Sequence, residues 1–155
     1  MTRVRVSIVD LYPIRETPSG LQVLVLRRGI GTRCTGAWEA VHGHIEGTES
    51  PMEAARRELL EETRLTPVRL YNLSRVESFY QHRTDEVSLI PVFVAFVDPV
   101  SPVVLSAEHD ASDWLSFPDA ASRFAWPRER RALADIQELL GSGSAGALSD
   151  VLRIE

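Results

Sequence analysis

Three glutamates in one short segment have the residue type and the spacing to bind a divalent cation. Glu61 and Glu62 lie three and four residues after Glu58, so on an α-helix the three carboxylates would be close neighbours. Like charges at this spacing destabilise a helix by roughly 0.2–0.5 kcal/mol per pair unless something neutralises them. Hard cations such as Mg²⁺ and Mn²⁺ prefer carboxylate oxygens. The spacing therefore indicates a Mg²⁺ site, with Mn²⁺ as a second possible ion; the alternative is a solvated acidic surface.

A helix over 51–63 is expected to position these carboxylates. Ser50 can cap the first backbone N–H groups, Pro51 suits the first helical position, and Glu53 completes a capping box. No glycine or proline interrupts the residues that follow. The face expected to be buried contains Met52, Ala55 and Leu59.

A short glycine-bounded turn comes immediately before this helix. Gly43 and Gly47 enclose it, and a backbone carbonyl of the turn could be a further metal ligand. Arg57 can pair with Glu49 across the junction between turn and helix. Because Arg57 directly precedes Glu58, the two side chains are not expected to point together.

The segment Gly43–Leu65 resembles the Nudix box, the signature of hydrolases acting on a nucleoside diphosphate linked to another moiety. That pattern is Gly, five residues, Glu, seven residues, then Arg-Glu-aliphatic-x-Glu-Glu-x-Gly-aliphatic. Arg64 stands where the family has glycine, which suggests that the helix ends with a different backbone geometry. The matching residues are Gly43, Glu49, Arg57, Glu58, Leu59, Glu61, Glu62 and Leu65.

The resemblance implies a Mg²⁺-dependent enzyme that hydrolyses a phosphoanhydride bond. Such a reaction needs the phosphate charge neutralised, the reacting oxygens held in line and a water deprotonated. By the resemblance, Glu58 and Glu62 are the principal metal ligands, and Glu61 and the Gly43 carbonyl complete the set. Arg57 belongs to the same catalytic segment.

The general base lies either in the box or on a later loop, where Glu108 is the candidate. Related enzymes carry a glutamate in a similar Glu-His and then Trp-Leu context, which Glu108-His109 and Trp114-Leu115 match. The family glutamate often binds metal or activates water. His109 is interpreted as structural or solvated.

Substrate contacts are expected from aromatic and charged residues outside the box. Aromatic rings can stack on a flat base or pterin, and Arg27 can reach a phosphate. The segment from Trp38 to Glu46 departs from the Pro-Gly-Gly sequence common before the box. Together with Arg64 and the segment after Glu108, it is similar to the dihydroneopterin triphosphate and dATP pyrophosphohydrolase branch. The candidate substrate-binding residues are Trp38, Arg27, Glu46 and Tyr80.

The expected reaction converts a nucleoside or pterin triphosphate to a monophosphate and pyrophosphate. Dinucleoside polyphosphates and nucleotide sugars are alternative substrates. An ADP-ribose substrate is disfavoured, because Tyr80 occupies the place where that branch typically has proline. A non-catalytic Nudix-fold regulator that binds a nucleotide is a further alternative. Isoprenoid diphosphate isomerisation would need a catalytic cysteine, for which Cys34 is poorly placed.

The whole chain has the size and composition of one globular domain. It has 155 residues, 44% of them hydrophobic, and a net charge of −5, which argues against non-specific binding to nucleic acid or anionic membranes. No apolar run reaches membrane length and no signal peptide is evident, so a cytoplasmic location is expected. Residues 1–140 are predicted to form one Nudix domain. A Gly/Ser-rich spacer and tail over 141–155 would pack back or contact a second subunit in a homodimer.

Alternating and apolar segments predict the remaining elements. A polar turn is expected over 13–20, and helices over 118–124 and 127–140. Strands flanking a central helix, with further helices at the end, predict a mixed sheet between helical layers. The residues alone predict an α+β protein; the α/β class, a Nudix-type α/β/α sandwich, is what the resemblance implies, and the mixed sheet agrees with it. The expected strands are 3–11, 21–26, 38–41, 68–73, 75–82, 86–97 and 113–117, with a possible extension over 103–105.

Overall fold

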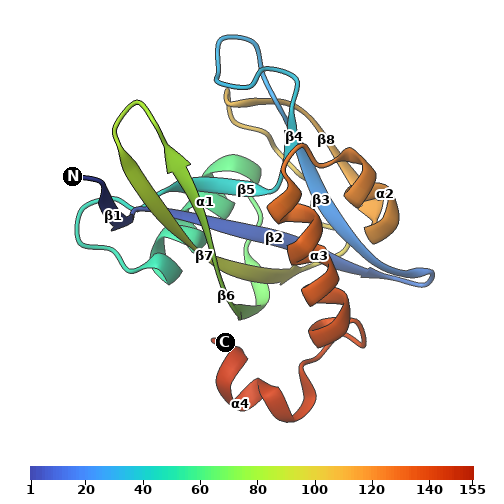
Figure 1. Cartoon of the computed structure of the whole chain (residues 1–155). Coiled ribbons are helices and arrows are strands. Elements are labelled where there is room, and N and C mark those ends of the chain that lie inside the picture. The colour runs from blue at the N-terminus through green and yellow to red at the C-terminus, as the bar shows by residue number, and fades with distance from the viewer.

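A mixed sheet of eight strands forms the centre of the fold (Figure 1). The computed structural model describes residues 1–155. The strands are β1 (Arg3–Val6), β2 (Ile8–Thr17), β3 (Gly20–Arg28), β4 (Trp38–Glu39), β5 (Val41–His44), β6 (Pro67–Gln81), β7 (Glu86–Val97) and β8 (His109–Ser116). The helices are α1 (Pro51–Thr63), α2 (Phe117–Arg123), α3 (Pro127–Leu140), the short 3₁₀ helix η1 (Gly146–Leu148) and α4 (Ser149–Leu152).

Strand β2 is shared between two parts of the sheet. It pairs antiparallel with β5 up to Leu11 and antiparallel with β3 from Ile14 onward. Along its other edge it pairs in parallel with β7. Because β5 and β3 leave β2 at different points, the sheet splits beside β2. The strands that carry the predicted site border this split.

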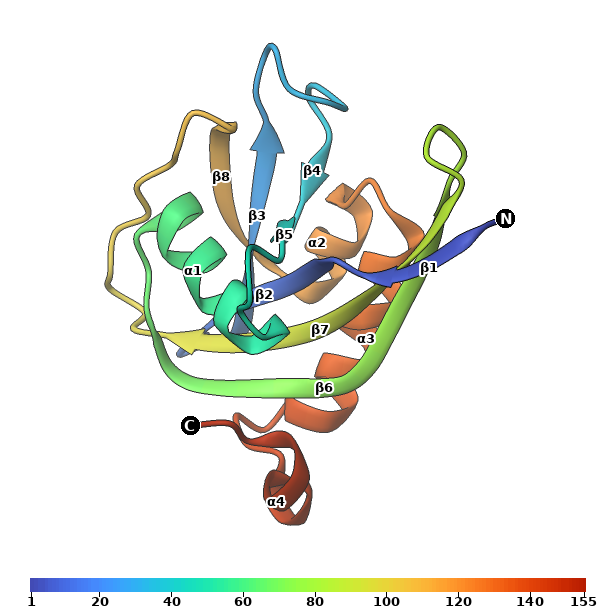
Figure 2. The same cartoon turned by 90° about the vertical axis from the view of Figure 1, so that its left-hand side faces the viewer.

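The sheet buries a different apolar cluster on each face. Alternate side chains of a strand point to opposite faces, so Leu11 packs towards α1 and Tyr12 towards α2 and α3. Ala55 and Leu59 of α1 are fully buried, as the helical periodicity predicts. Helix α1 and the pair α2 and α3 thus cover opposite faces (Figure 2). The predicted α/β/α sandwich is confirmed.

The N-terminal part of the chain differs from the prediction. One strand over 3–11 was expected, but β1 and β2 are separate strands and β2 continues to Thr17. The predicted turn over 13–20 is too long, because Pro13 and Ile14 pair with Ala95 and Phe96 of β7, and only residues 18 and 19 form the turn between β2 and β3. Burying Ile14 completely outweighs the turn preference of a nearby proline.

Strand β6 is a single bent strand rather than the two that were predicted. Its register against β7 shifts between Asn72 and Val76, and Ser74 has a positive φ of 49°. Val76 lies opposite Pro91, which has no N–H to donate and therefore favours a bulge at this point of the strand pair. No strand forms over 103–105, although the Val104 N–H donates a hydrogen bond to the carbonyl of Thr63.

The C-terminal segment packs back onto its own chain. Leu152 is buried, and the Ile154 N–H donates to the carbonyl of Leu70 at 2.8 Å. The Asn72 side chain donates to the carbonyls of Val151 and Leu152. The tail thus packs back as one of the two alternatives has it, and the homodimer stays a prediction.

No helix in the structure combines the length and the apolar character needed to cross a bilayer.

Candidate metal and substrate site

Helix α1 is fixed at its start by the predicted capping box. The hydroxyl of Ser50 accepts a hydrogen bond from the Glu53 N–H, and the Glu53 carboxylate accepts one from the Ser50 N–H. Burial of Ala55 and Leu59 against the sheet then sets the rotation of the helix. This rotation turns Glu58 and Glu62 inwards and leaves Glu61 exposed.

Gly43 lies directly against the carboxylate of Glu58. A Cβ atom placed on Gly43 would be 2.0 Å from the Glu58 carboxyl carbon, so no other residue fits at this position without displacing the carboxylate. Gly43 is held in β5 by its pairing with Val9 of β2. The predicted ligand role of the Gly43 carbonyl stays a prediction.

The second inward glutamate, Glu62, is buried without any hydrogen-bond partner. It is 2% exposed, and neither of its carboxylate oxygens accepts a hydrogen bond. One of these oxygens, an oxygen of Glu108 and a ring nitrogen of His109 all lie within 4.8 Å of one another. A buried carboxylate without a partner is costly. The residues present therefore fit a bound cation.

The electrostatic environment of the cluster also favours a cation. Burial raises the pKa of Glu62 well above its usual value, and the charges of Glu58 and Glu108 raise it further. Burial likewise raises the pKa of Glu58, partly offset by Arg57, while Glu61 and Glu108 add to the increase. Glu58 and Glu62 thus resist ionisation because they are buried and because other carboxylates are near. A divalent cation would favour the ionised form of all of them.

Arg57 joins the turn to the helix through several hydrogen bonds. Its Nη2 donates to Glu49 Oε1 at 2.6 Å and to the carbonyl of His44 at 2.8 Å, which confirms the predicted pairing with Glu49. Its Nη1 donates to Glu58 Oε1 at 2.9 Å and to Glu61 Oε2 at 3.2 Å. The expectation that Arg57 and Glu58 point apart is therefore wrong, because the long guanidinium reaches both Glu58 and Glu61, which follow it in the helix. The hydrogen bonds from Arg57 to Glu49 and Glu58 raise the pKa of the guanidinium.

The end of α1 also differs from the prediction. Arg64 was expected to give the helix a different exit from a glycine. Instead it adopts the left-handed conformation, with φ 63° and ψ 12°, and its N–H donates to the carbonyl of Leu60. The backbone thus has the conformation that glycine usually supplies at a helix end. Because Arg64 has a Cβ atom, this conformation is strained.

A buried chain of polar side chains joins the acidic cluster to β4. His109 Nε2 lies 3.0 Å from Glu39 Oε1, which also accepts from Arg28 Nη1 at 2.9 Å. Burial raises the pKa of Glu39, but hydrogen bonds from His109 and Arg28 and the charge of His42 outweigh it, so the net pKa is lowered. His109, predicted to be structural or solvated, is buried and adjoins the acidic cluster.

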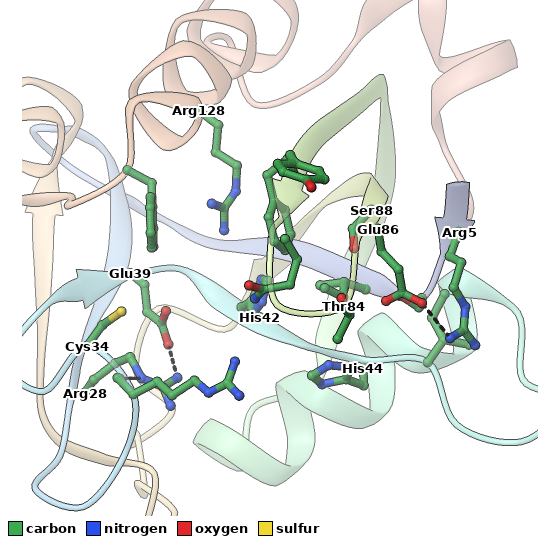
Figure 3. A pocket seen from close by; sticks show the side chains of 18 residues that line it. Arg5, Arg28, Cys34, Glu39, His42, His44, Thr84, Glu86, Ser88 and Arg128 are labelled. Carbon is green, nitrogen blue, oxygen red and sulfur yellow. Dashed lines mark hydrogen bonds and ion pairs between the residues drawn. The ribbon is translucent and has the colours of Figure 1, made fainter. Parts of the chain in front are cut away.

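A cleft of about 840 Å³ lies next to this polar chain (Figure 3). Successive residues of a strand face opposite sides of the sheet. In β5, Gly43 faces α1, and the side chains of His42 and His44 therefore face the cleft. The cleft does not include Glu58, Glu62 or Glu108; Glu39 and Arg28 are the residues that the cleft and the polar chain share. The lining residues are Arg5, Ser7, Ile8, Arg28, Arg33, Cys34, Glu39, His42, His44, Ile45, Phe79, Tyr80, Gln81, Thr84, Glu86, Ser88, Trp126 and Arg128.

A buried aspartate contacts two basic side chains that line the cleft. Asp10 Oδ1 lies 2.6 Å from His42 Nδ1, and Asp10 Oδ2 accepts from Arg128 Nε at 2.9 Å. Burial raises the pKa of Asp10, but the hydrogen bond and charge of His42 and the charge of Arg128 together lower it below its usual value. His42 and Arg128, which line the cleft, are therefore both held by one buried carboxylate.

The four predicted substrate-binding residues do not lie together. Tyr80 lines the cleft. Trp38 instead packs against the core, with the guanidinium groups of Arg27 and Arg123 over its ring at 5.8 and 4.7 Å from the centroid. Arg27 pairs with Asp110, and Glu46 is exposed beside Arg57.

The sequence prediction missed the polar residues that connect the cleft and the cluster. Asp10 stands between the buried residues Val9 and Leu11, and Glu39 stands between half-buried Trp38 and buried Ala40. A single acid in such a strand is the one signal in the sequence that could have found them, because acids are seldom buried without a partner. Nothing local to His42 or His109 indicates their partners.

Comparisons with known proteins agree with this fold. A model of the NUDIX domain family matches residues 1–136. Similar solved structures include an Ap4A hydrolase of Caenorhabditis elegans, with a TM-score of 0.73, 20% identity and coverage of 87% of this chain and 97% of that chain. A NUDIX hydrolase of Listeria monocytogenes has a TM-score of 0.72 and 26% identity, covering 87% and 94%. The MutT protein of Methanosarcina mazei has a TM-score of 0.68 and 26% identity, covering 88% and 95%.

One curated relative is an octanoyltransferase of Myxococcus xanthus, 39% identical over 117 residues. The match covers 74% of this chain but 32% of that protein, so this chain spans about a third of its relative's length. The family assignment rests instead on the NUDIX match, which extends over most of the chain. With the box residues gathered at the junction of turn and helix, this chain belongs to the NUDIX domain family.

Proposed function

We propose that this protein is a hydrolase that cleaves a phosphoanhydride bond of a nucleotide-like substrate with a bound Mg²⁺ ion. The observation that carries the proposal is the buried carboxylate of Glu62, whose oxygens have no partner and lie beside Glu108 and His109. Glu58, Glu62 and Glu108 would hold the ion, and the carbonyl of Gly43 is a further candidate ligand. When bound, the ion would neutralise a diphosphate and lower the pKa of a water.

The other site residues would hold these carboxylates in place. Arg57 fixes the turn through Glu49 and, through Glu58 and Glu61, limits the movement of the acidic side chains. The close contact between Gly43 and Glu58 places one carboxylate against the edge of β5. Glu58 and Glu108 are the two candidates to accept the proton of the attacking water.

The cleft supports a substrate of nucleotide size. Ligand pockets commonly have volumes of roughly 300–1,000 Å³, and this cleft has about 840 Å³. Tyr80 and Trp126 offer aromatic surfaces, and Arg28, Arg33 and Arg128 offer positive charge for phosphates. We infer that a nucleoside or pterin triphosphate lies with its ring in the cleft and its phosphates at the acidic cluster. The products would be a monophosphate and pyrophosphate.

The first test is a product-release assay with Mg²⁺ over nucleoside triphosphates, dihydroneopterin triphosphate, dinucleoside polyphosphates and nucleotide sugars. Glu58→Gln and Glu62→Gln should each lower kcat by roughly 10²–10⁴ while folding is retained, because a metal-dependent contact in the transition state is lost. Glu138→Gln, on the exposed face of α3, is the matched control and should keep full activity. Equal turnover in all variants would contradict the proposal, and binding without turnover would favour a regulator.

The same assay can identify the proton acceptor. Glu108→Gln is compared with Glu58→Gln for both kcat and metal affinity. The residue whose amide variant loses kcat but keeps its metal affinity is the base. If both variants lose metal affinity in proportion to kcat, neither glutamate acts as the base.

A further inference from the structure

We propose that His109 supplies a nitrogen ligand to the cation, so that the site binds a first-row transition ion such as Mn²⁺ more tightly than Mg²⁺. The inference rests on the metal site of the proposed function and names one more residue of that site. The Nudix box contains no nitrogen ligand among its matched residues. His109 comes instead from the start of β8.

The ligand atoms are close enough to share one ion. One ring nitrogen of His109, one oxygen of Glu62 and one oxygen of Glu108 lie within 4.8 Å of one another. Two ligands on opposite sides of an ion, each roughly 2.0–2.3 Å from it, are about 4.0–4.6 Å apart. Small side-chain movements therefore bring all three atoms onto one cation.

Two of the three side chains are buried and lack the partners that buried polar groups normally have. His109 is 4% exposed, and its Nδ1 atom has no hydrogen-bond partner. Both carboxylate oxygens of buried Glu62 also lack a hydrogen-bond partner. Buried polar atoms without a partner are uncommon and point to a missing ion or water. The acidic cluster thus contains an imidazole and a carboxylate that each require a further contact.

Glu39 orients the imidazole as a metal ligand requires. His109 Nε2 donates to Glu39 Oε1 at 3.0 Å, and Arg28 Nη1 holds the same oxygen at 2.9 Å. With the proton on Nε2, a neutral imidazole carries its free lone pair on Nδ1, the atom that has no partner. A carboxylate behind a metal-bound histidine fixes the tautomer and strengthens the ligand.

The ligand set determines which ion binds best. Mg²⁺ prefers oxygen ligands, whereas imidazole suits first-row transition ions, whose affinity rises from Mn²⁺ to Co²⁺ and beyond. A site of carboxylates alone would discriminate less between Mg²⁺ and Mn²⁺. Because Arg28 lines the cleft and holds Glu39, substrate charge beside Arg28 can also affect the orientation of His109.

The direct test is pulsed EPR of Mn²⁺ bound to the whole protein without substrate. The wild type should show nitrogen coupling from one imidazole, and ¹⁵N-histidine labelling should change the coupling frequency. His109→Asn should abolish the coupling. His82→Asn, in the exposed turn between β6 and β7, is the matched control and should retain it. A wild-type spectrum without nitrogen coupling overturns the proposal even if His109→Asn fails to fold.

Metal affinity gives a second measurement by calorimetry. His109→Asn should weaken Mn²⁺ binding at least about tenfold and change Mg²⁺ binding much less. Glu39→Gln, which keeps the size of the side chain, should weaken Mn²⁺ binding about tenfold by loosening the ring. Equal losses for both ions in His109→Asn overturn the ligand assignment.

The two proposals fail in different ways. Mn²⁺ with nitrogen coupling in a protein that hydrolyses no phosphoanhydride supports the ligand assignment and contradicts the proposed function. Hydrolysis with Mg²⁺ and no nitrogen coupling supports the function and contradicts the ligand assignment.

Discussion

Single residues at the junction of turn and helix set the geometry of the metal site. Gly43 allows the Glu58 carboxylate to lie against β5, and Arg57 holds that carboxylate from the other side. This part of the site could be predicted from sequence because it consists of residues close together in the chain. The roles of Asp10, Glu39 and His109 could not be predicted, because these roles arise from contacts with distant residues.

Arg64 provides a stability prediction at this scale. A side chain in the left-handed region is strained by roughly 1–2 kcal/mol relative to glycine. Arg64→Gly should therefore raise the free energy of unfolding by about 1 kcal/mol and the Tm by about 2–4 °C. Arg64→Ala is the control and should not be more stable than the wild type. Equal melting temperatures for the two variants would show that the conformation is not strained.

Arg57 provides the second prediction, on both stability and activity. Arg57→Ala removes the hydrogen bonds to Glu49 and Glu58 and should cost about 1–3 kcal/mol in the free energy of unfolding. It should also lower kcat, because Glu58 loses the group that positions it. Its neighbour Arg56 pairs only with Glu155 at a partly exposed site, so Arg56→Ala should cost less than about 1 kcal/mol and keep kcat. Denaturant unfolding and steady-state kinetics on both variants make the comparison.

At the scale of elements, the sequence predicted helices better than strands. The capping box, the proline at the helix start and the apolar spacing all lie within α1, and the structure contains each of them. The limits of β2 depend on its pairing with β3, β5 and β7. Each of these strands pairs with only part of β2. Local turn preferences near Pro13 were therefore overridden by burial.

The start of α3 provides a pH prediction. Glu129 is buried; one of its oxygens accepts from the N–H of Ala40 and the other from the N–H of Trp126. Burial raises its pKa from 4.5 to about 8, although the Ala40 hydrogen bond opposes the shift. The folded state therefore binds this proton more tightly than the unfolded state does, so its contribution to stability is complete below pH 4.5 and is lost as the pH rises through about 8.

The measurement is the free energy of unfolding of the wild type and of Glu129→Gln between pH 5 and pH 9. Because the glutamine does not titrate, the wild type should lose stability relative to the variant as the pH rises, by at most about 1.4 kcal/mol per pH unit. A difference that is independent of pH would show that Glu129 is ionised in the fold at every pH tested.

At the scale of the whole molecule, the C-terminal tail is part of the packed structure. Leu152 contributes to the larger apolar cluster, and Ile154 and Glu155 hydrogen-bond to Leu70 at the edge of β6. Leu152→Ala should cost about 2–4 kcal/mol in the free energy of unfolding. Val151→Ala, on the exposed side of α4, is the control and should cost much less. Equal small effects would show that the tail is not docked in solution.

The split of the sheet beside β2 has a consequence for the order of folding. The split forms when β3 and β5 have both joined β2, and the sheet around it is complete only when β7, which is far from β2 in the sequence, has joined the other edge. Closing such long loops costs entropy before any contact is gained, so these pairings form slowly. A chain still emerging from the ribosome would lack both β7 and His109, and so could not yet bind a metal ion tightly. Metal-induced resistance to proteolysis should consequently appear only in molecules that have completed the sheet.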